Sequence, residues 1–248
     1  MPQANKGNTP SQGSRAPRRI FDIEQFIKLL VAGDRVGCRE FLREYIAAGN
    51  DSLQALETLV WPACAAIDQL SRKDQILPIH EHAAMMLLAQ LVQRLECGLV
   101  KHPARCRQVI VTSGRSPSEE LAAEIFAGLA EADGFDVVFL GGGVESDDLF
   151  AEVGRRLPQF VISFAAAGSD APRLRRLIDA VRRQDPVPGL QIGVGGGVFE
   201  RVPGLAEEIG AHFSGDTPFE LLQALQEAAS GPRAGINRSV HARRARAA

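Results

Sequence analysis

The chain has 248 residues, and 45% of them are hydrophobic, which is enough for a substantial core in one large domain or two ordinary ones. Its net charge of -2 excludes a general electrostatic attraction of the whole protein to nucleic acid. The 4 cysteines are scattered without a Cys-x-x-Cys pair, so we expect reduced thiols in a cytoplasmic protein rather than a disulfide framework or a zinc site.

Both ends of the chain are basic. Residues 1–19 contain Lys6 and arginines, residues 231–248 contain arginines, and neither stretch has an acidic residue, which predicts two disordered, solvated tails. The alternative for these tails is contact with nucleic acid or with an acidic partner. We expect no signal peptide, because the first residues lack an apolar region. We also expect no contact with a membrane, because no run of apolar residues approaches the length of a span.

From residue 20 to about residue 101 the pattern of apolar residues is helical and predicts four helices with short joints. The first two helices end at Gly33-Asp34 and at Gly49-Asn50, which are typical stop signals. Asp51 or Ser52 caps the third helix, which Pro62 kinks or restarts. Pro78 begins the fourth helix, and four such helices indicate a small bundle.

Residues 106–230 have a different pattern, in which short apolar runs alternate with helical stretches. The runs are RQVIVTS, FDVVFLGGG, QFVISFAAAG and LQIGVGGG, with a fifth short strand near AHFSG. The expected helices are 118–133, 147–157, 171–184 and 218–229. The predicted fold class is therefore α/β: an N-terminal helical bundle followed by a doubly wound parallel sheet with helices on both faces.

Ligands of such a sheet bind at the carboxyl ends of its strands. These ends are Thr112–Gly114, Gly141–Gly143, Ser163–Gly168 and Gly195–Gly197. The glycine triplets either let the backbone approach a ligand or only form tight turns, and the sequence leaves both readings open. A dinucleotide site needs Gly-x-Gly-x-x-Gly after the first strand, where Gly114 stands alone, and a P-loop is also absent.

This layout resembles the cobalamin-binding-domain family, in which a four-helix cap precedes a flavodoxin-like domain, as in cobalamin-dependent repressors and corrinoid carrier proteins. In that family the first strand ends in Gly-Asp-x-His-x-x-Gly, whose histidine ligates cobalt from below. The matching stretch here runs from Gly114 to Glu120. Gly114 is kept, Arg115 replaces the acid and Pro117 replaces the histidine. The resemblance thus implies a cofactor loop whose cobalt ligand has been lost.

The resemblance implies three further positions near the cofactor. The family has a Ser-x-Leu stretch after the third strand, whose serine contacts the cofactor's nucleotide tail, and ISFAA keeps Ser163 there. The family's Gly-Gly turn, which makes room for that tail, is provided by Gly195, Gly196 and Gly197. His212 stands where the family has an acid before the last helix, and it is placed close enough to reach the same cleft.

The helical cap provides a second match. Many repressor-type caps carry Trp-x9-Glu-His, and the Glu-His pair corresponds to Glu81 and His82. The tryptophan position is Ser71, while Trp61 lies ten residues too early and is expected to fill the bundle core. The resemblance places His82 as a metal ligand on the upper face of the cofactor, with Glu81 beside it. The alternative for His82 is a histidine at a helix end that hydrogen-bonds locally.

The resemblance implies a non-enzymatic cobalamin-binding module with a sensory or regulatory role and a regulatory protein partner. The lean toward cobalamin over haem rests on Ser163 and the Gly195–Gly197 turn, because haem has no nucleotide tail. Alternatives of the same fold are a haem-binding sensor and an interaction scaffold without ligand. A corrinoid carrier in methyl transfer is a further alternative, although such carriers use the histidine that Pro117 replaces.

Overall fold

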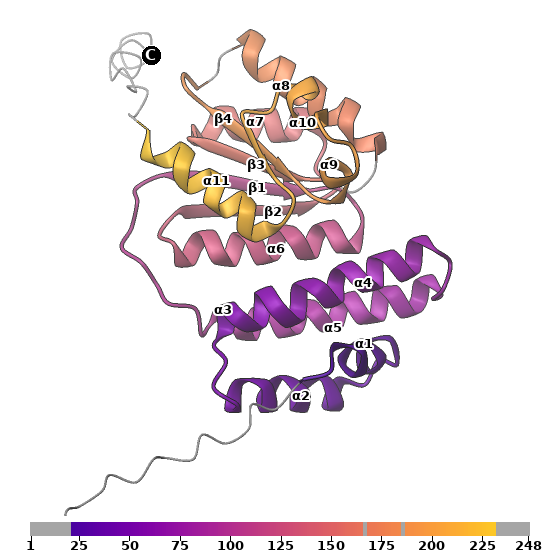
Figure 1. Cartoon of the computed structure of the whole chain (residues 1–248). Helices are drawn as coiled ribbons and strands as arrows, with labels where there is room; N and C mark the ends of the chain where they lie inside the picture. Colours follow the sequence, from indigo (N-terminus) through magenta and orange to yellow (C-terminus); the bar gives the residue numbers. More distant parts are fainter. Residues whose placement is uncertain (1–20, 166–167, 185–186, 232–248) are drawn as a thin grey trace, which may run out of the picture.

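The computed structural model describes residues 21–165, 168–184 and 187–231, so both basic tails lie outside the described residues. The first part of the chain forms helices, as predicted. They are α1 (Ile23–Val31), α2 (Arg35–Ala47), α3 (Ser52–Ala55), α4 (Trp61–Arg72) and α5 (Pro78–Glu96). In Figure 1 these helices form a separate layer below the sheet and its helices.

The helix starts follow the capping residues that the sequence offers. The side chains of Asp22 and Asp34 accept hydrogen bonds from the first turns of α1 and α2. Asp51 forms a full capping box with Gln54 at the start of α3. Pro78 is the first residue of α5, where its missing N–H has no cost. α3 and α5 therefore begin where the sequence predicts.

The third predicted helix is interrupted by a π-helical turn. This turn, Leu56–Val60, joins α3 to α4 without a break in the helical path. Such a turn inserts one extra residue into an α-helix. Pro62 follows directly, and its ring and missing N–H are tolerated there because the regular hydrogen-bond ladder has already been shifted.

The second part of the chain is a five-stranded parallel sheet. Its strands are β1 (Gln108–Ser113), β2 (Asp136–Gly142), β3 (Phe160–Phe164), β4 (Gln191–Gly195) and β5 (Phe213–Gly215). Their order is β2-β1-β3-β4-β5, which is the flavodoxin-like order, and every pair is parallel. Ser113, Phe164, Gly195 and Gly215 pair in one row, which marks the carboxyl edge of the sheet.

Helices cover both faces of the sheet (Figure 1). The helices of the lower face are α6 (Pro117–Ala132) and α11 (Pro218–Ser230). The helices of the upper face are α7 (Ser146–Arg156), α8 (Ala171–Gln184), α9 (Gly197–Arg201) and α10 (Leu205–Ile209). The short α9 and α10 and a 3-10 turn at Gly168–Asp170 are absent from the sequence-based prediction.

The bundle packs directly on α6. Leu121, Ile125 and Leu129 of α6 belong to the same hydrophobic cluster as the bundle core, while Ala122 and Phe126 face the sheet. Full burial of such aliphatic side chains stabilises by about 1.5–3 kcal/mol each, so α6 holds the two parts of the chain together. Within the described ranges, no helix has the length and apolar character needed to cross a membrane.

Candidate functional site

A cleft lies between the bundle and the carboxyl edge of the sheet. It contains about 510 Å³ of space and is partly open to solvent. Its walls come from α4, the start of α6, the start of α9 and the turn after β5, and they are formed by Trp61, Cys64, Ala65, Asp68, Arg72, Ser118, Glu119, Ala122, Gly196, Gly197, Glu200, Arg201 and Asp216. This position agrees with the rule that ligands of open parallel sheets bind beyond the carboxyl ends of the strands.

One side of α4 forms the bundle wall of the cleft. Trp61, Ala65, Asp68 and Arg72 recur at intervals of three and four residues and therefore share this side. Trp61 is half-buried and contacts both the bundle core and the core beneath the sheet. The expected packing of Trp61 against the bundle core is therefore confirmed, and the structure adds a contact with the core beneath the sheet.

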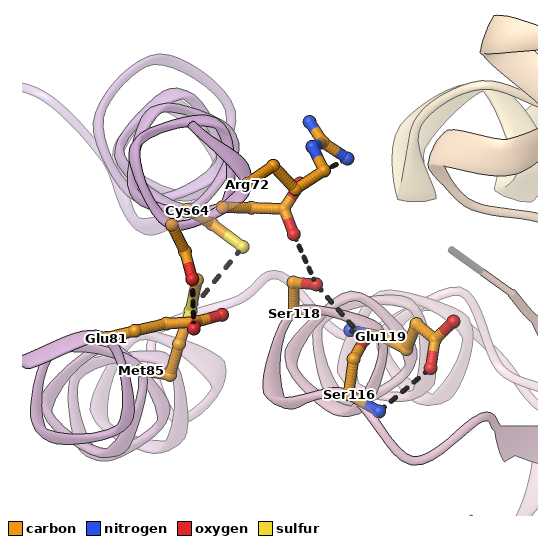
Figure 2. A network of polar contacts seen from close by, with 9 residues as sticks. Cys64, Arg72, Glu81, Met85, Ser116, Ser118 and Glu119 are labelled. Atoms are coloured by element: carbon orange, nitrogen blue, oxygen red, sulfur yellow. Dashed lines mark hydrogen bonds and ion pairs between the residues drawn. The ribbon is translucent and has the colours of Figure 1, made fainter. Parts of the chain in front are cut away.

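A polar network connects α4 to the first turn of α6 across the cleft (Figure 2). The hydroxyl of Ser118 donates to Asp68 Oδ1 at 3.0 Å, and the guanidinium of Arg72 binds Asp68 Oδ2 at 2.7 Å. Ser116 caps α6, and its backbone N–H donates a hydrogen bond of 3.0 Å to the carboxylate of Glu119. The start of α6 is therefore fixed both by its own capping box and by the bundle.

Glu119 is buried, with 4% of its surface exposed, and its carboxylate lies against Gly114. Nothing in the sequence shows that a bundle helix covers this turn, so sequence reasoning did not identify Glu119 as a buried residue. Pro117 is the first residue of α6 and has no side-chain nitrogen that could bind a metal.

The opposite wall of the cleft is the turn after β4. Gly196 has φ of 107°, and a Cβ there would lie only 3.0 Å from the backbone nitrogen of Ala165. A side chain at this position is thus strained and obstructed by backbone. A Cβ at Gly197 would meet only the flexible end of Arg201 at 2.7 Å. The two glycines therefore have different reasons to lack a side chain.

Ser163 does not line this cleft. Along β3, Val161 and Ala165 belong to the core under α7 and α8, and alternation along the strand puts Ser163 on that same face. The cleft lies on the side of α6. Ser163 is fully buried, and its hydroxyl has no hydrogen-bond partner in the described structure. Its predicted contact with a nucleotide tail therefore stays a prediction.

Glu81 and His82 are not among the described residues that line the cleft. The hydroxyl of Ser71 donates to the carboxylate of Glu81, so Glu81 is bound to the position where the family motif has tryptophan. His82 is the fifth residue of α5 and is exposed. Its predicted metal role therefore stays a prediction. Among the described residues, no group of three or more His, Cys, Asp or Glu side chains could hold a metal ion.

His212 lies at the other end of the sheet. Its Nδ1 accepts a hydrogen bond of 2.9 Å from the N–H of Ile192, at the start of β4. Burial, and then the positive charge of Arg182, lower the pKa of His212. The expectation that His212 reaches the cleft is wrong, because the residue precedes β5 and the cleft lies beyond the ends of the strands.

Sulfur atoms lie beside the cleft inside the bundle. The thiol of Cys64 lies 3.9 Å from the thioether sulfur of Met85 on α5. Burial raises the pKa of the Cys64 thiol, and the carboxylates of Asp68 and Glu81 raise it further. Cys64 is therefore a neutral thiol at physiological pH, which makes it a packing residue rather than a nucleophile.

Two family models match the chain. Residues 107–223 match a B12 binding domain, and residues 22–96 match a second B12 binding domain model that covers the helical part. Together these matches span well over half of the chain. The protein therefore belongs to the cobalamin-binding-domain family, whose cofactor is cobalamin. A search of curated proteins found no significant match.

Solved structures with a similar fold include other corrinoid proteins. The monomethylamine corrinoid protein of Methanosarcina barkeri is 18% identical, with a TM-score of 0.68 over 84% of this chain and 97% of that chain. A cobalamin-binding protein from Desulfitobacterium hafniense DCB-2 is 17% identical, with a TM-score of 0.44 over 84% of this chain and 99% of that one. The methanol:cobalamin methyltransferase complex MtaBC of M. barkeri is 15% identical, with a TM-score of 0.45 over 85% and 80%. At these identities the first similarity shows the fold alone.

The cleft fits a corrinoid in part. It lies at the edge where this fold binds ligands, and the turn of Gly196 and Gly197 adds no side chain to its wall. Its charged groups suit the amide side chains that surround a corrin ring, since carboxylates accept from amides and guanidinium groups donate to them. The loop from Gly114 to Glu119, however, offers no imidazole beneath a metal.

Proposed function

We propose that the protein is a non-enzymatic cobalamin-binding module that signals the presence of its cofactor to a regulatory protein partner. The observation that supports this role is the hydrogen bond between Ser118 and Asp68, which closes the cleft between α4 and α6. A corrin ring with its amide side chains is larger than the cleft of about 510 Å³. Binding therefore requires the bundle to move away from the edge of the sheet.

The cofactor would then bind the opened arrangement of the chain more tightly than the closed one. Such a difference in affinity is the physical requirement for a ligand-driven switch. The α4 end of the bundle is held to α6 by the polar link, while Leu121, Ile125 and Leu129 fix α6 to the bundle core. We infer that α4 moves and that the apolar contacts along α6 stay in place. A partner would then recognise the bundle in its displaced position.

Hydrogen–deuterium exchange with and without cobalamin tests this role, and Ser118→Ala provides the variant. Loss of one net hydrogen bond of about 0.5–1.5 kcal/mol lowers the cost of opening, so the variant should bind cobalamin about two- to tenfold more tightly. Ser71→Ala is the matched control, because its hydroxyl binds Glu81 within the bundle and does not cross the cleft. Cobalamin binding that leaves exchange in α4 unchanged would contradict the switch.

We propose further that His82 faces the bound cofactor. Gln93 of α5 donates to Glu124 of α6 at 3.1 Å, and His82 lies about three turns earlier on the same side of α5. The two helices run in the same direction, since Glu96 lies against Gly128 one turn further along. His82 therefore projects beyond the first residue of α6, toward the edge that holds the cleft.

His82→Ala should change the absorption bands of bound cobalamin and leave the melting temperature unchanged, because the side chain is exposed. Identical spectra for the variant and the wild type would remove His82 from the metal site. A titration of the wild type with haem distinguishes a cobalamin sensor from a haem sensor. If neither ligand binds, the protein would be an interaction scaffold.

A corrinoid carrier in methyl transfer is a less favoured role. The fold similarity to the monomethylamine corrinoid protein does not extend to residue roles at 18% identity. By resemblance, carriers use the loop histidine that Pro117 replaces. A regulatory protein partner is therefore proposed here in place of a methyltransferase.

A further inference from the structure

The layer between the sheet and helices α6 and α11 is filled by aromatic rings. Phe164, the last residue of β3, is fully buried, and its ring centroid lies 5.7 Å from that of Phe126 on α6. Phe160 contacts the rings of Phe135 and Phe213, each with 6.3 Å between centroids. Rings at these distances form close-packed pairs, so this layer is a continuous core up to the carboxyl edge of the sheet.

The glycines of β4 do not create space in this layer. A Cβ at Gly195 would lie 2.9 Å from Leu221 Cδ2 and 3.1 Å from Phe164 Cε1. A Cβ at Gly193 would lie 2.7 Å from Ile162 Cδ1 and would also meet the ring of Phe213. Both glycines are therefore needed so that neighbouring side chains can approach the strand. They leave no channel for part of a ligand.

The layer on the other face of the sheet is filled as well. Val161 and Ala165 of β3 pack there against Leu174, Val198 and other apolar side chains of α8 and α9. Ser163, which shares this face, is fully buried among them.

The cleft, in contrast, lies outside both layers. Trp61 of α4 and the buried Ala122 of α6 are among the residues that line it. One turn beyond Ala122, Phe126 and Phe164 close the way into the sheet. The polar groups of the cleft, among them Asp68, Arg72, Glu200 and Asp216, surround this outer space.

We propose that the domain recognises the corrin ring alone and leaves the nucleotide tail outside the protein core. This inference rests on the proposed binding of cobalamin. The filled layers exclude the tail, and the charged walls of the cleft hold the ring through its amide groups. Corrinoids that lack the tail, such as cobinamide, therefore bind with the same affinity as cobalamin. Because the base is not drawn into the protein, it also stays coordinated to cobalt when cobalamin binds.

Absorbance titrations of the full chain with aquocobalamin and with diaquocobinamide test the proposal. We expect the two dissociation constants to agree within about threefold, because both ligands make the same contacts. Arg72→Ala should weaken both by the same factor, since its guanidinium lies on the wall of the cleft. Bound cobalamin should retain the absorption bands of base-coordinated cobalt.

Two results would overturn the proposal, and they are distinguishable. Cobalamin that binds more than about thirtyfold tighter than cobinamide, with bands that show loss of its base, would mean that the tail enters the protein. Cobalamin binding would then stand while tail-independent recognition fails. If neither corrinoid binds, the proposed function fails and the inference fails with it.

Discussion

Glu96 makes the contact between the bundle and α6 sensitive to pH. It is the last residue of α5 and is half-buried against Gly128 of α6, near the carboxylates of Glu124 and Glu131. Its pKa is raised from 4.5 to about 7, first by burial and then by the charges of the two glutamates, while Lys101 opposes this rise. The same burial raises the pKa of Glu124, against the hydrogen bond from Gln93. The informative substitution is Glu96→Gln, which keeps the shape and removes the charge.

The size and sign of the effect follow from linkage. A carboxyl whose folded pKa exceeds its unfolded value favours the folded state fully below pH 4.5, and this contribution is lost as pH rises through about 7. Each pKa unit corresponds to about 1.4 kcal/mol, which sets an upper bound of about 3 kcal/mol. Because Glu96 is only half-buried, screening by solvent reduces the expected loss to about 1–2 kcal/mol.

Urea denaturation at pH 5 and at pH 8 measures this loss. From pH 5 to pH 8, the free energy of unfolding of the wild type should fall by about 1–2 kcal/mol more than that of Glu96→Gln. The exposed Glu57 of the same bundle provides the control, because Glu57→Gln should keep the pH dependence of the wild type. An equal pH dependence in the wild type and in Glu96→Gln would refute the reasoning.

Two substitutions at the cleft give further tests. Gly196→Ala should lower stability by about 1–3 kcal/mol, because its φ of 107° and the backbone of Ala165 oppose a side chain. Gly197→Ala, which meets only the end of Arg201, should stay within about 0.5 kcal/mol; equal losses in thermal denaturation would contradict this difference. Pro117→His should introduce a nitrogen ligand at the start of α6. With cobinamide, the Co(II) resonance of the ¹⁵N-labelled variant should then show splitting that the wild type lacks, and no splitting would mean that this loop does not face the metal.

The fold was predictable because each level of the sequence agrees with it. Capping residues, stop signals and the change from helical periodicity to short β-branched runs specify the bundle and the alternation of strands and helices. The four helices expected in the α/β part begin and end within one residue of the observed ones, whereas β3 ends at Phe164, four residues before the end of the predicted run. The short helices α9 and α10 were missed because one turn of helix has too little periodicity to detect.

The site was less predictable for reasons that lie in packing. Every residue of β3 is buried, so no alternation of polar and apolar residues reveals which face Ser163 occupies. Asp68 and Arg72 have the pattern of a solvated helix surface, and only the docking of the bundle on α6 turns that surface into a wall of the cleft. The position of Gly196 and Gly197 at the cleft was predictable, because residues that follow a strand of a parallel sheet lie at its carboxyl edge, where ligands bind.

The π-helical turn at Leu56–Val60 sets the rotational phase of everything that follows it in the helix. An α-helix turns by about 100° per residue, so removing the inserted residue would rotate α4 by that angle relative to α3. Asp68 would then leave Ser118, and the buried side of α4 would no longer match the bundle core. A single-residue insertion thus allows one continuous helix to pack in the bundle at its start and to contact α6 beside the cleft at its end.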